Sequence, residues 1–238
     1  MTGTLNLETC DSPDAVAHRA VAFIAEEARN TVNARGKFVL GVSSESTSTQ
    51  MLRLLAAEKL PWPAIHIVQV DDKVVPADDA NRNLTHLRES LRGSEALGRV
   101  YPMPVEAADP IEGAVQYAAT LESIAGSPPV LDLIHLELAA DGHVASLVPN
   151  DAVLHFIAPD VAITSPYQGT ARMTLTYPII NRARRILWVV TGAEKAPIFR
   201  RLLDGDESIP AAQVRHEHVL VLADKAAAAE LNGSRDRH

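Results

Sequence analysis

The chain is poor in cysteine, with only Cys10 among its 238 residues, and this scarcity excludes a framework of internal disulfides. No apolar run approaches the roughly 18 residues that a membrane-spanning helix needs. The first residues, 1–8, contain neither the basic nor the apolar segment of a secretion signal. We therefore expect a cytoplasmic protein that does not contact a membrane.

Aromatic residues and positive charge are also scarce. Aromatic residues make up 4% of the chain, so the core must consist of valine, leucine, isoleucine and alanine. The net charge of -8 argues against nucleic acid as a partner, because phosphate backbones are bound by clustered lysine and arginine. A small anionic molecule can still bind in a local basic pocket. We expect a small-molecule ligand and a monomer or weak homo-oligomer.

Strands and helices alternate along the chain in the pattern of a parallel sheet. The expected strands cover residues 37–43, 64–70, 98–103, 131–138, 161–164, 173–176, 186–191 and 218–222. The expected helices cover residues 11–34, 47–58, 83–91, 111–124, 193–203 and 224–231. No proline-rich or glycine-rich linker divides them. We predict one domain over residues 1–238, with a Rossmann-like, three-layer α/β/α fold around a mostly parallel sheet.

The most informative segment is Asp141-Gly142-His143, which directly follows the predicted strand 131–138. Open α/β sheets bind ligands at the carboxyl ends of their strands. Histidine exchanges protons near neutral pH, so His143 is the candidate base and acid. Polar segments also follow other strands, at residues 43–47, 71–73 and 191–195. We expect all these segments to meet in one cleft.

Two consecutive carboxylates, Asp71 and Asp72, end one of these strands. They are either a paired acid and base, or one faces the cleft while the other caps a helix or faces solvent. Adjacent residues of a strand point in opposite directions, which favours the second interpretation.

Five segments, in this order, resemble the motifs of the 6-phosphogluconolactonase family, which belongs to a wider group with glucosamine-6-phosphate isomerases and ribose-5-phosphate isomerase. The segments cover residues 43–48, 69–76 with Asn83, 137–149, 172–184 and 190–196. The last one matches the family's V-T-G-x-x-K-A in full. After Asp-Gly-His the chain continues Val-Ala-Ser-Leu-Val-Pro, which is similar to the lactonases, whereas the isomerases continue I-A-F-N-E-P.

The resemblance implies a hydrolase of the pentose phosphate pathway that opens 6-phospho-D-glucono-1,5-lactone to 6-phosphogluconate without a metal or cofactor. Such a reaction needs an activated water, stabilisation of the carbonyl oxygen and recognition of the phosphate. His143 would move the proton, and Asp71 would orient His143 or a sugar hydroxyl. The expected substrate-binding residues are Ser46, Thr47, Lys73, Gly142, Arg172 and Lys195.

The chain departs from the family pattern at Ser44, Glu45, Glu137 and Ala139, where the family has glycines. A glutamate facing a phosphate at 4 Å costs about 1 to 4 kcal/mol, depending on the local dielectric. Two further functions therefore stay open: a hydrolase of another sugar lactone, and a non-catalytic protein that binds a sugar acid or a partner. A sugar-phosphate isomerase or deaminase is a third, less favoured alternative.

Overall fold

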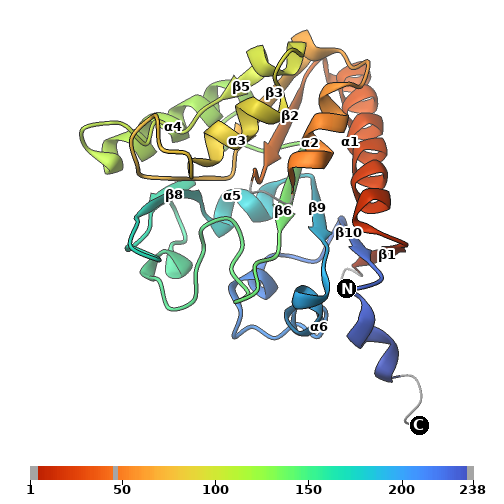
Figure 1. Cartoon of the computed structure of the whole chain (residues 1–238). Coiled ribbons are helices and arrows are strands. Elements are labelled where there is room, and N and C mark those ends of the chain that lie inside the picture. Colours follow the sequence, from red (N-terminus) through yellow and green to blue (C-terminus); the bar gives the residue numbers. More distant parts are fainter. Residues whose placement is uncertain (1–4, 45–47, 235–238) are drawn as a thin grey trace.

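The computed structural model describes residues 5–44 and 48–234, and a seven-stranded sheet organises them (Figure 1). Its strand order is β1-β10-β9-β6-β2-β3-β5, and every neighbouring pair is parallel. The strands are β1 Asn6–Cys10, β2 Phe38–Val42, β3 Ile65–Gln69, β5 Val100–Tyr101, β6 Leu133–Glu137, β9 Arg185–Val190 and β10 Val219–Asp224. The predicted parallel α/β architecture is confirmed.

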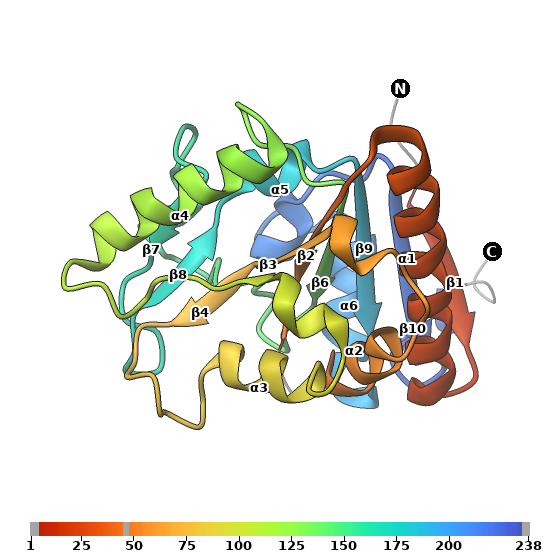
Figure 2. The same cartoon turned by 90° about the horizontal axis from the view of Figure 1, so that it is seen from above.

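Helices cover both faces of this sheet, as the prediction of three layers requires (Figure 2). The α-helices are α1 Pro13–Arg35, α2 Thr49–Ala56, α3 Asn83–Ser90, α4 Pro110–Ala125, α5 Tyr177–Arg182 and α6 Ala196–Leu203. One apolar core joins the sheet to α1, α2 and α3, and a second core joins the opposite face to α4, α5 and α6. Short 3-10 helices are η2 Trp62–Ala64, η3 Glu95–Arg99, η4 Ala152–His155, η5 Ala193–Lys195, η6 Pro210–Gln213 and η7 Ala229–Ser234.

Burial on both faces explains the composition of the central strands. All five residues of β2 are buried, so the strand has no polar face and its sequence is a continuous apolar run. The longest helix, α1, begins where the Ser12 hydroxyl accepts a hydrogen bond from Ala15 N, and it ends at Gly36 with φ 79°. None of the helices in residues 5–44 and 48–234 is both long and apolar enough to cross a membrane.

The strand order changes direction between β2 and β6, and this change locates the site. From β2 the chain continues outward to β3 and β5, whereas β6, β9 and β10 lie on the other side of β2. At such a switch point the loops that follow two adjacent strands diverge and leave a crevice at their carboxyl ends. The segment Asp141–His143 follows β6, so it lies at this crevice.

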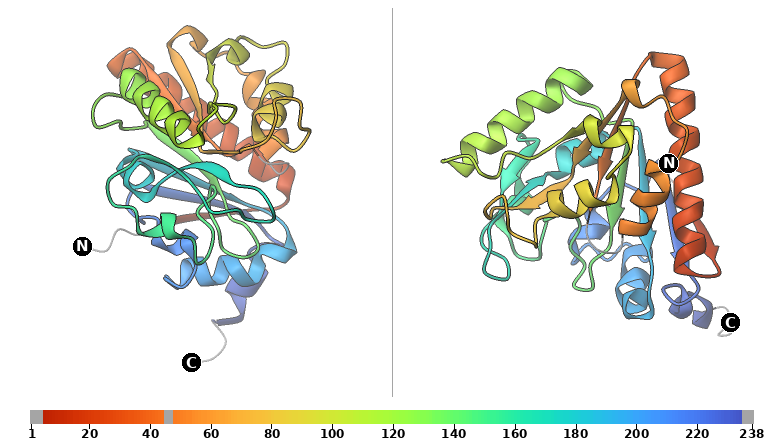
Figure 3. Two further views of the ribbon diagram at one scale, coloured as in Figure 1. Left: turned by 90° about the vertical axis from the view of Figure 1, so that its left-hand side faces the viewer. Right: turned by 45° about the horizontal axis from the view of Figure 1, so that its top comes forward.

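A second, antiparallel sheet of three strands was not expected. It has the order β4-β8-β7, with β4 Asp71–Lys73, β7 Val161–Ile163 and β8 Arg172–Leu175. Its apolar residues belong to the same core as α4, and the loop after β6 lies beside it in both views of Figure 3. The strands expected at 161–164 and 173–176 therefore exist, but they belong to this second sheet.

Three further elements differ from the prediction. The edge strand β1 and the short helix α5 were missed, and the helix expected over 224–231 is wrong. There β10 continues to Asp224, and turns follow before η7. Asp224 Oδ1 accepts a local hydrogen bond from Ala227 N and a tertiary one from Gly192 N, and the tertiary contact overrides the helix propensity of the alanines.

Candidate active site

A cavity of about 330 Å³ lies where the loops after β3 and β6 meet the small sheet. Its lining residues are Lys73, Asn81, Asn83, His86, His143, Gln168 and Arg172. The structure thus brings together three residues that the sequence singled out separately: a histidine from the loop after β6, a lysine from β4 and an arginine from β8.

His143 is held by a carboxylate within its own motif. Its Nδ1 lies 2.7 Å from Asp141 Oδ1, and its backbone N donates to the same oxygen at 3.2 Å. In the tautomer that donates from Nδ1, Nε2 carries no proton and can accept one from water. The other Asp141 oxygen accepts a hydrogen bond from the Tyr167 hydroxyl at 2.6 Å. Burial raises the pKa of Asp141, but these hydrogen bonds and the neighbouring histidine outweigh it, and the pKa is lowered overall.

Gly142 allows the turn between Asp141 and His143. Its φ is 86°, and a Cβ atom there would lie 2.7 Å from Cβ of Ile209. Its N donates to Ala139 O at 3.0 Å, and its carbonyl accepts from Ala211 N at 3.0 Å. Glycine is therefore required here by the backbone, whereas a direct contact of Gly142 with a substrate stays a prediction.

Asp71 is buried and joins β4 to α3 and to the loop after β6. It is 2% exposed and accepts hydrogen bonds from Ser146 Oγ at 2.7 Å and from Asn83 Nδ2 at 3.1 Å. Ser44 Oγ in turn donates to the carbonyl of Asn83. Asp141 is a carboxylate that contacts the His143 ring, and a role of Asp71 in orienting His143 or a sugar hydroxyl stays a prediction. The signal for the Asp141 contact was present in the sequence, because Asp141 precedes His143 by two residues.

The second carboxylate of the pair, Asp72, has a structural role. It is fully buried and accepts hydrogen bonds from Asn83 N at 2.9 Å and from Arg82 Nη2 at 3.1 Å. Asp72 thereby caps the first turn of α3 and pairs with a buried arginine. This supports the second interpretation of the two aspartates, in which one of them caps a helix. Asp72 is the capping residue, and it forms a buried ion pair and does not face solvent.

Lys73 and Arg172 form a cationic pair across the small sheet. They are directly opposite each other in the register of β4 and β8. Arg172 is only 5% exposed, and its Nε has no hydrogen-bond partner among the described residues. Neither side chain forms an ion pair with a carboxylate in residues 5–44 and 48–234. Like charges facing each other destabilise a sheet, so this arrangement favours an anion in the cavity.

The remaining predicted residues have different outcomes. Ser46 and Thr47, like the substituted Glu45, lie outside the described residues. Lys195 ends η5 and is half-buried, and its contact with a substrate stays a prediction. Of the substituted positions, Glu137 accepts a hydrogen bond from Ser48 Oγ, the residue before α2, and Ala139 N donates to His143 O at 3.1 Å.

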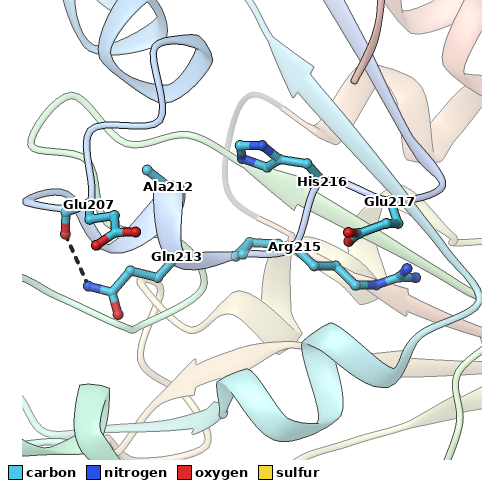
Figure 4. Close-up of a pocket in the computed structure, with 7 residues that line it drawn as sticks. Glu207, Ala212, Gln213, Arg215, His216 and Glu217 are labelled. Atoms are coloured by element: carbon cyan, nitrogen blue, oxygen red, sulfur yellow. Dashed lines mark hydrogen bonds between the residues drawn. The ribbon is translucent and has the colours of Figure 1, made fainter. Parts of the chain in front are cut away.

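A larger and more open depression of about 690 Å³ lies elsewhere, along the segment before β10 (Figure 4). Gln213 Nε2 donates to the carbonyl of Glu207 at 3.2 Å on its wall. Its lining contains Arg215 and His216 but none of the residues expected in the site. The smaller cavity, which combines His143 with two cations, is therefore the candidate active site.

Comparison with known proteins identifies the family of the chain. Residues 11–222 match the model of the family described as glucosamine-6-phosphate isomerases/6-phosphogluconolactonase. The chain belongs to this family. It is similar to the 6-phosphogluconolactonase of Synechocystis sp., with 32% identity over 183 residues that cover 74% of this chain and 76% of the relative.

Two further relatives span more of the chain. The 6-phosphogluconolactonase of Nostoc sp. is 28% identical over 236 residues, which cover 95% of this chain and 98% of the relative. The crystal structure of a 6-phosphogluconolactonase from Shewanella baltica superimposes with a TM-score of 0.82 at 25% identity, covering 94% of this chain and 99% of that one. The family assignment therefore extends over nearly the whole fold.

Sequence reasoning missed several residues of the pocket. Asn81, His86 and Gln168 line the cavity, and Tyr167 contacts Asp141. His86 lies in α3, three residues after Asn83 and therefore on the same face of the helix. This spacing could have indicated that His86 lies near the site. Tyr167 and Gln168 lie in the loop between β7 and β8, where no motif indicated them.

Proposed function

We propose that the chain hydrolyses 6-phospho-D-glucono-1,5-lactone to 6-phosphogluconate. The observation that carries the proposal is the His143–Asp141 pair in one cavity with Lys73 and Arg172. A base held by a carboxylate suits activation of water, and two cations that form no ion pair with a carboxylate of residues 5–44 and 48–234 suit a phosphate. Similarity to 6-phosphogluconolactonases over most of the chain supports the same reaction.

In the proposed mechanism, His143 Nε2 takes a proton from water while the water oxygen attacks the lactone carbonyl carbon. The carbonyl oxygen gains negative charge, and Asp141 balances the positive charge on the imidazole ring. The bond from the carbonyl carbon to the ring oxygen then breaks. His143 returns its proton to that oxygen, so the product is an open-chain hydroxy acid and the base is restored.

The same proposal assigns the phosphate to Lys73 and Arg172. Arginine offers a planar fork of donors, and lysine offers a compact charge on a flexible stem. Ser46, Thr47, Gly142 and Lys195 are proposed as further substrate contacts. We also propose that the protein acts in the cytoplasm. We propose further that it is a monomer or weak homo-oligomer, and size-exclusion chromatography with light scattering would test this oligomeric state.

The test follows the lactone carbonyl carbon by 13C NMR in purified protein. The wild type should accelerate its loss above the spontaneous rate, and His143→Ala should abolish that acceleration. His66→Ala is a matched control, because His66 also has a side-chain partner, Tyr101, but does not line the cavity. No acceleration by the wild type would refute the proposal. A ketose or released ammonia as product, from sugar phosphates, would instead indicate an isomerase or deaminase.

A further inference from the structure

Tyr167 contacts the His143–Asp141 pair and also Arg172. Its hydroxyl donates to Asp141 Oδ2 at 2.6 Å, while Asp141 Oδ1 holds His143. The edge of its ring meets the His143 ring, with centroids 5.7 Å apart and planes at 69°. Its other contact is with Arg172, whose Cζ lies 5.2 Å from the centre of the same ring. One side chain therefore contacts the base, its carboxylate and a phosphate-binding candidate.

The loop that holds Tyr167 is built to present it. Residues 164–171 connect β7 to β8, and Tyr167 and Thr170 exchange backbone hydrogen bonds of 3.0 and 3.2 Å. Gln168 and Gly169 form the tip of this tight turn, both with positive φ. The turn places Tyr167 beside Arg172, the first residue of β8, and against the loop after β6.

From this geometry we propose that Tyr167 is a positioning residue that fixes Asp141 through its hydroxyl and Arg172 through its ring. The expected effects on kcat and KM rest on the proposed lactonase function. The expected effect on the Asp141 carboxyl group does not. The hydroxyl keeps Asp141 ionised and aimed at His143 Nδ1. The ring holds the guanidinium by a cation–π contact, in a place where no carboxylate of the described chain does so.

The two contacts can be separated by substitution. Tyr167→Phe removes only the hydroxyl, and Tyr167→Leu also removes the aromatic face. A hydrogen bond to a charged group contributes about 1.5 to 3 kcal/mol, so complete loss of its effect lowers kcat by roughly tenfold to a hundredfold. We expect about a tenfold loss of kcat in Tyr167→Phe, because the backbone of His143 still holds Asp141.

The expected pattern splits kcat from KM. Tyr167→Phe should lower kcat, leave KM for the phosphorylated lactone close to that of the wild type, and raise the pKa of Asp141. The shift has this sign because the Tyr167 hydrogen bond lowers the pKa of Asp141, and removing the bond raises it. Tyr167→Leu should in addition raise KM several-fold for the phosphorylated lactone but not for unphosphorylated glucono-1,5-lactone.

Tyr101→Phe is the matched control. Tyr101 also contacts a histidine, with its hydroxyl 2.8 Å from His66 Nδ1 and ring centroids 5.4 Å apart, but it does not line the cavity. This variant should keep the wild-type kcat, KM and Asp141 titration. A loss in Tyr101→Phe equal to that in Tyr167→Phe would reduce the Tyr167 effect to a general cost of losing a tyrosine hydroxyl.

A readout without turnover separates this proposal from the proposed function. The titration of the Asp141 carboxyl carbon, followed by 13C NMR, should move to higher pH in Tyr167→Phe and stay in place in Tyr101→Phe. An unshifted Asp141 titration, or wild-type kcat in Tyr167→Phe, overturns the positioning role. If the wild type shows no turnover, the proposed function fails, and the Asp141 titration alone decides the role of Tyr167.

Discussion

Replacement of Gly142 by alanine should destabilise the protein by two separable effects. Gly142 has a φ of 86°, a left-handed conformation that costs a residue with a Cβ about 1 to 2 kcal/mol. The new Cβ would also lie 2.7 Å from Ile209 Cβ and 2.9 Å from Ile209 Cγ2. Ile209 cannot withdraw freely, because Ala211 N, two residues on, is hydrogen-bonded to the Gly142 carbonyl at 3.0 Å. Overpacking of this kind costs about 1 to 3 kcal/mol.

Gly93→Ala isolates the second effect. Gly93 has a similar φ of 79°, but a Cβ there would meet nothing within 4 Å. Both variants share the backbone strain and the entropy change of the unfolded chain. Urea denaturation should therefore find Gly142→Ala less stable than Gly93→Ala by about 1 to 3 kcal/mol. In a chain of this length that corresponds to a melting temperature lower by about 2 to 12 °C.

The same comparison has a functional arm. Because His143 follows Gly142 directly, relief of the overlap would displace the histidine, and kcat should fall in Gly142→Ala but not in Gly93→Ala. Equal free energies of unfolding for the two variants would refute the reasoning, since a Cβ at Gly142 crowds Ile209 and Ile198 whereas a Cβ at Gly93 meets nothing within 4 Å. Reduced stability with full activity would show that the loop relaxes away from the pocket.

Two other predictions concern buried groups. Burial lowers the pKa of His135 from an ordinary 6.5 to about 4, so the folded protein should lose about 3 kcal/mol of its free energy of unfolding as the pH falls from 6.5 to 4. His135→Leu should remove that dependence in urea denaturation series, and an unchanged slope would contradict the assignment. Arg172→Met should raise KM for the phosphorylated lactone roughly tenfold to a hundredfold without lowering stability, because the buried cation forms no ion pair within the described chain. Equal KM changes for the unphosphorylated lactone would show that Arg172 does not bind the phosphate.

The central sheet could be predicted from the sequence because its signals are local. The apolar run at 37–43 is β2, and the run at 131–138 contains β6, both buried between two layers of helices. His143 could be placed at a strand end for the same reason. The helix expected at 224–231 failed because Asp224 is the last residue of β10 and accepts a hydrogen bond from Gly192 N, a contact between residues 32 apart in sequence.

Pairing across the small sheet could not be predicted in the same way. Lys73 and Arg172 lie in two separate segments that resemble family motifs. That they face each other across the sheet depends on the register of β4 and β8. Likewise, the Tyr167 hydroxyl reaches Asp141 only because the turn between β7 and β8 folds over the pocket. A sequence pattern reports the neighbours along the chain, whereas these contacts depend on tertiary structure.

Glu137 and Ala139 stand where the family has glycines, and this difference bears on whether the family activity is retained. Glycine is indispensable where φ is positive or where a Cβ would collide, as at Gly142. Neither Glu137 nor Ala139 has a positive φ. Ala139 still donates its N–H to His143 O, and Glu137 accepts a hydrogen bond from Ser48. The backbone thus accommodates both side chains while the loop after β6 keeps His143 against Asp141, so these two departures from the family pattern do not argue for a non-catalytic protein.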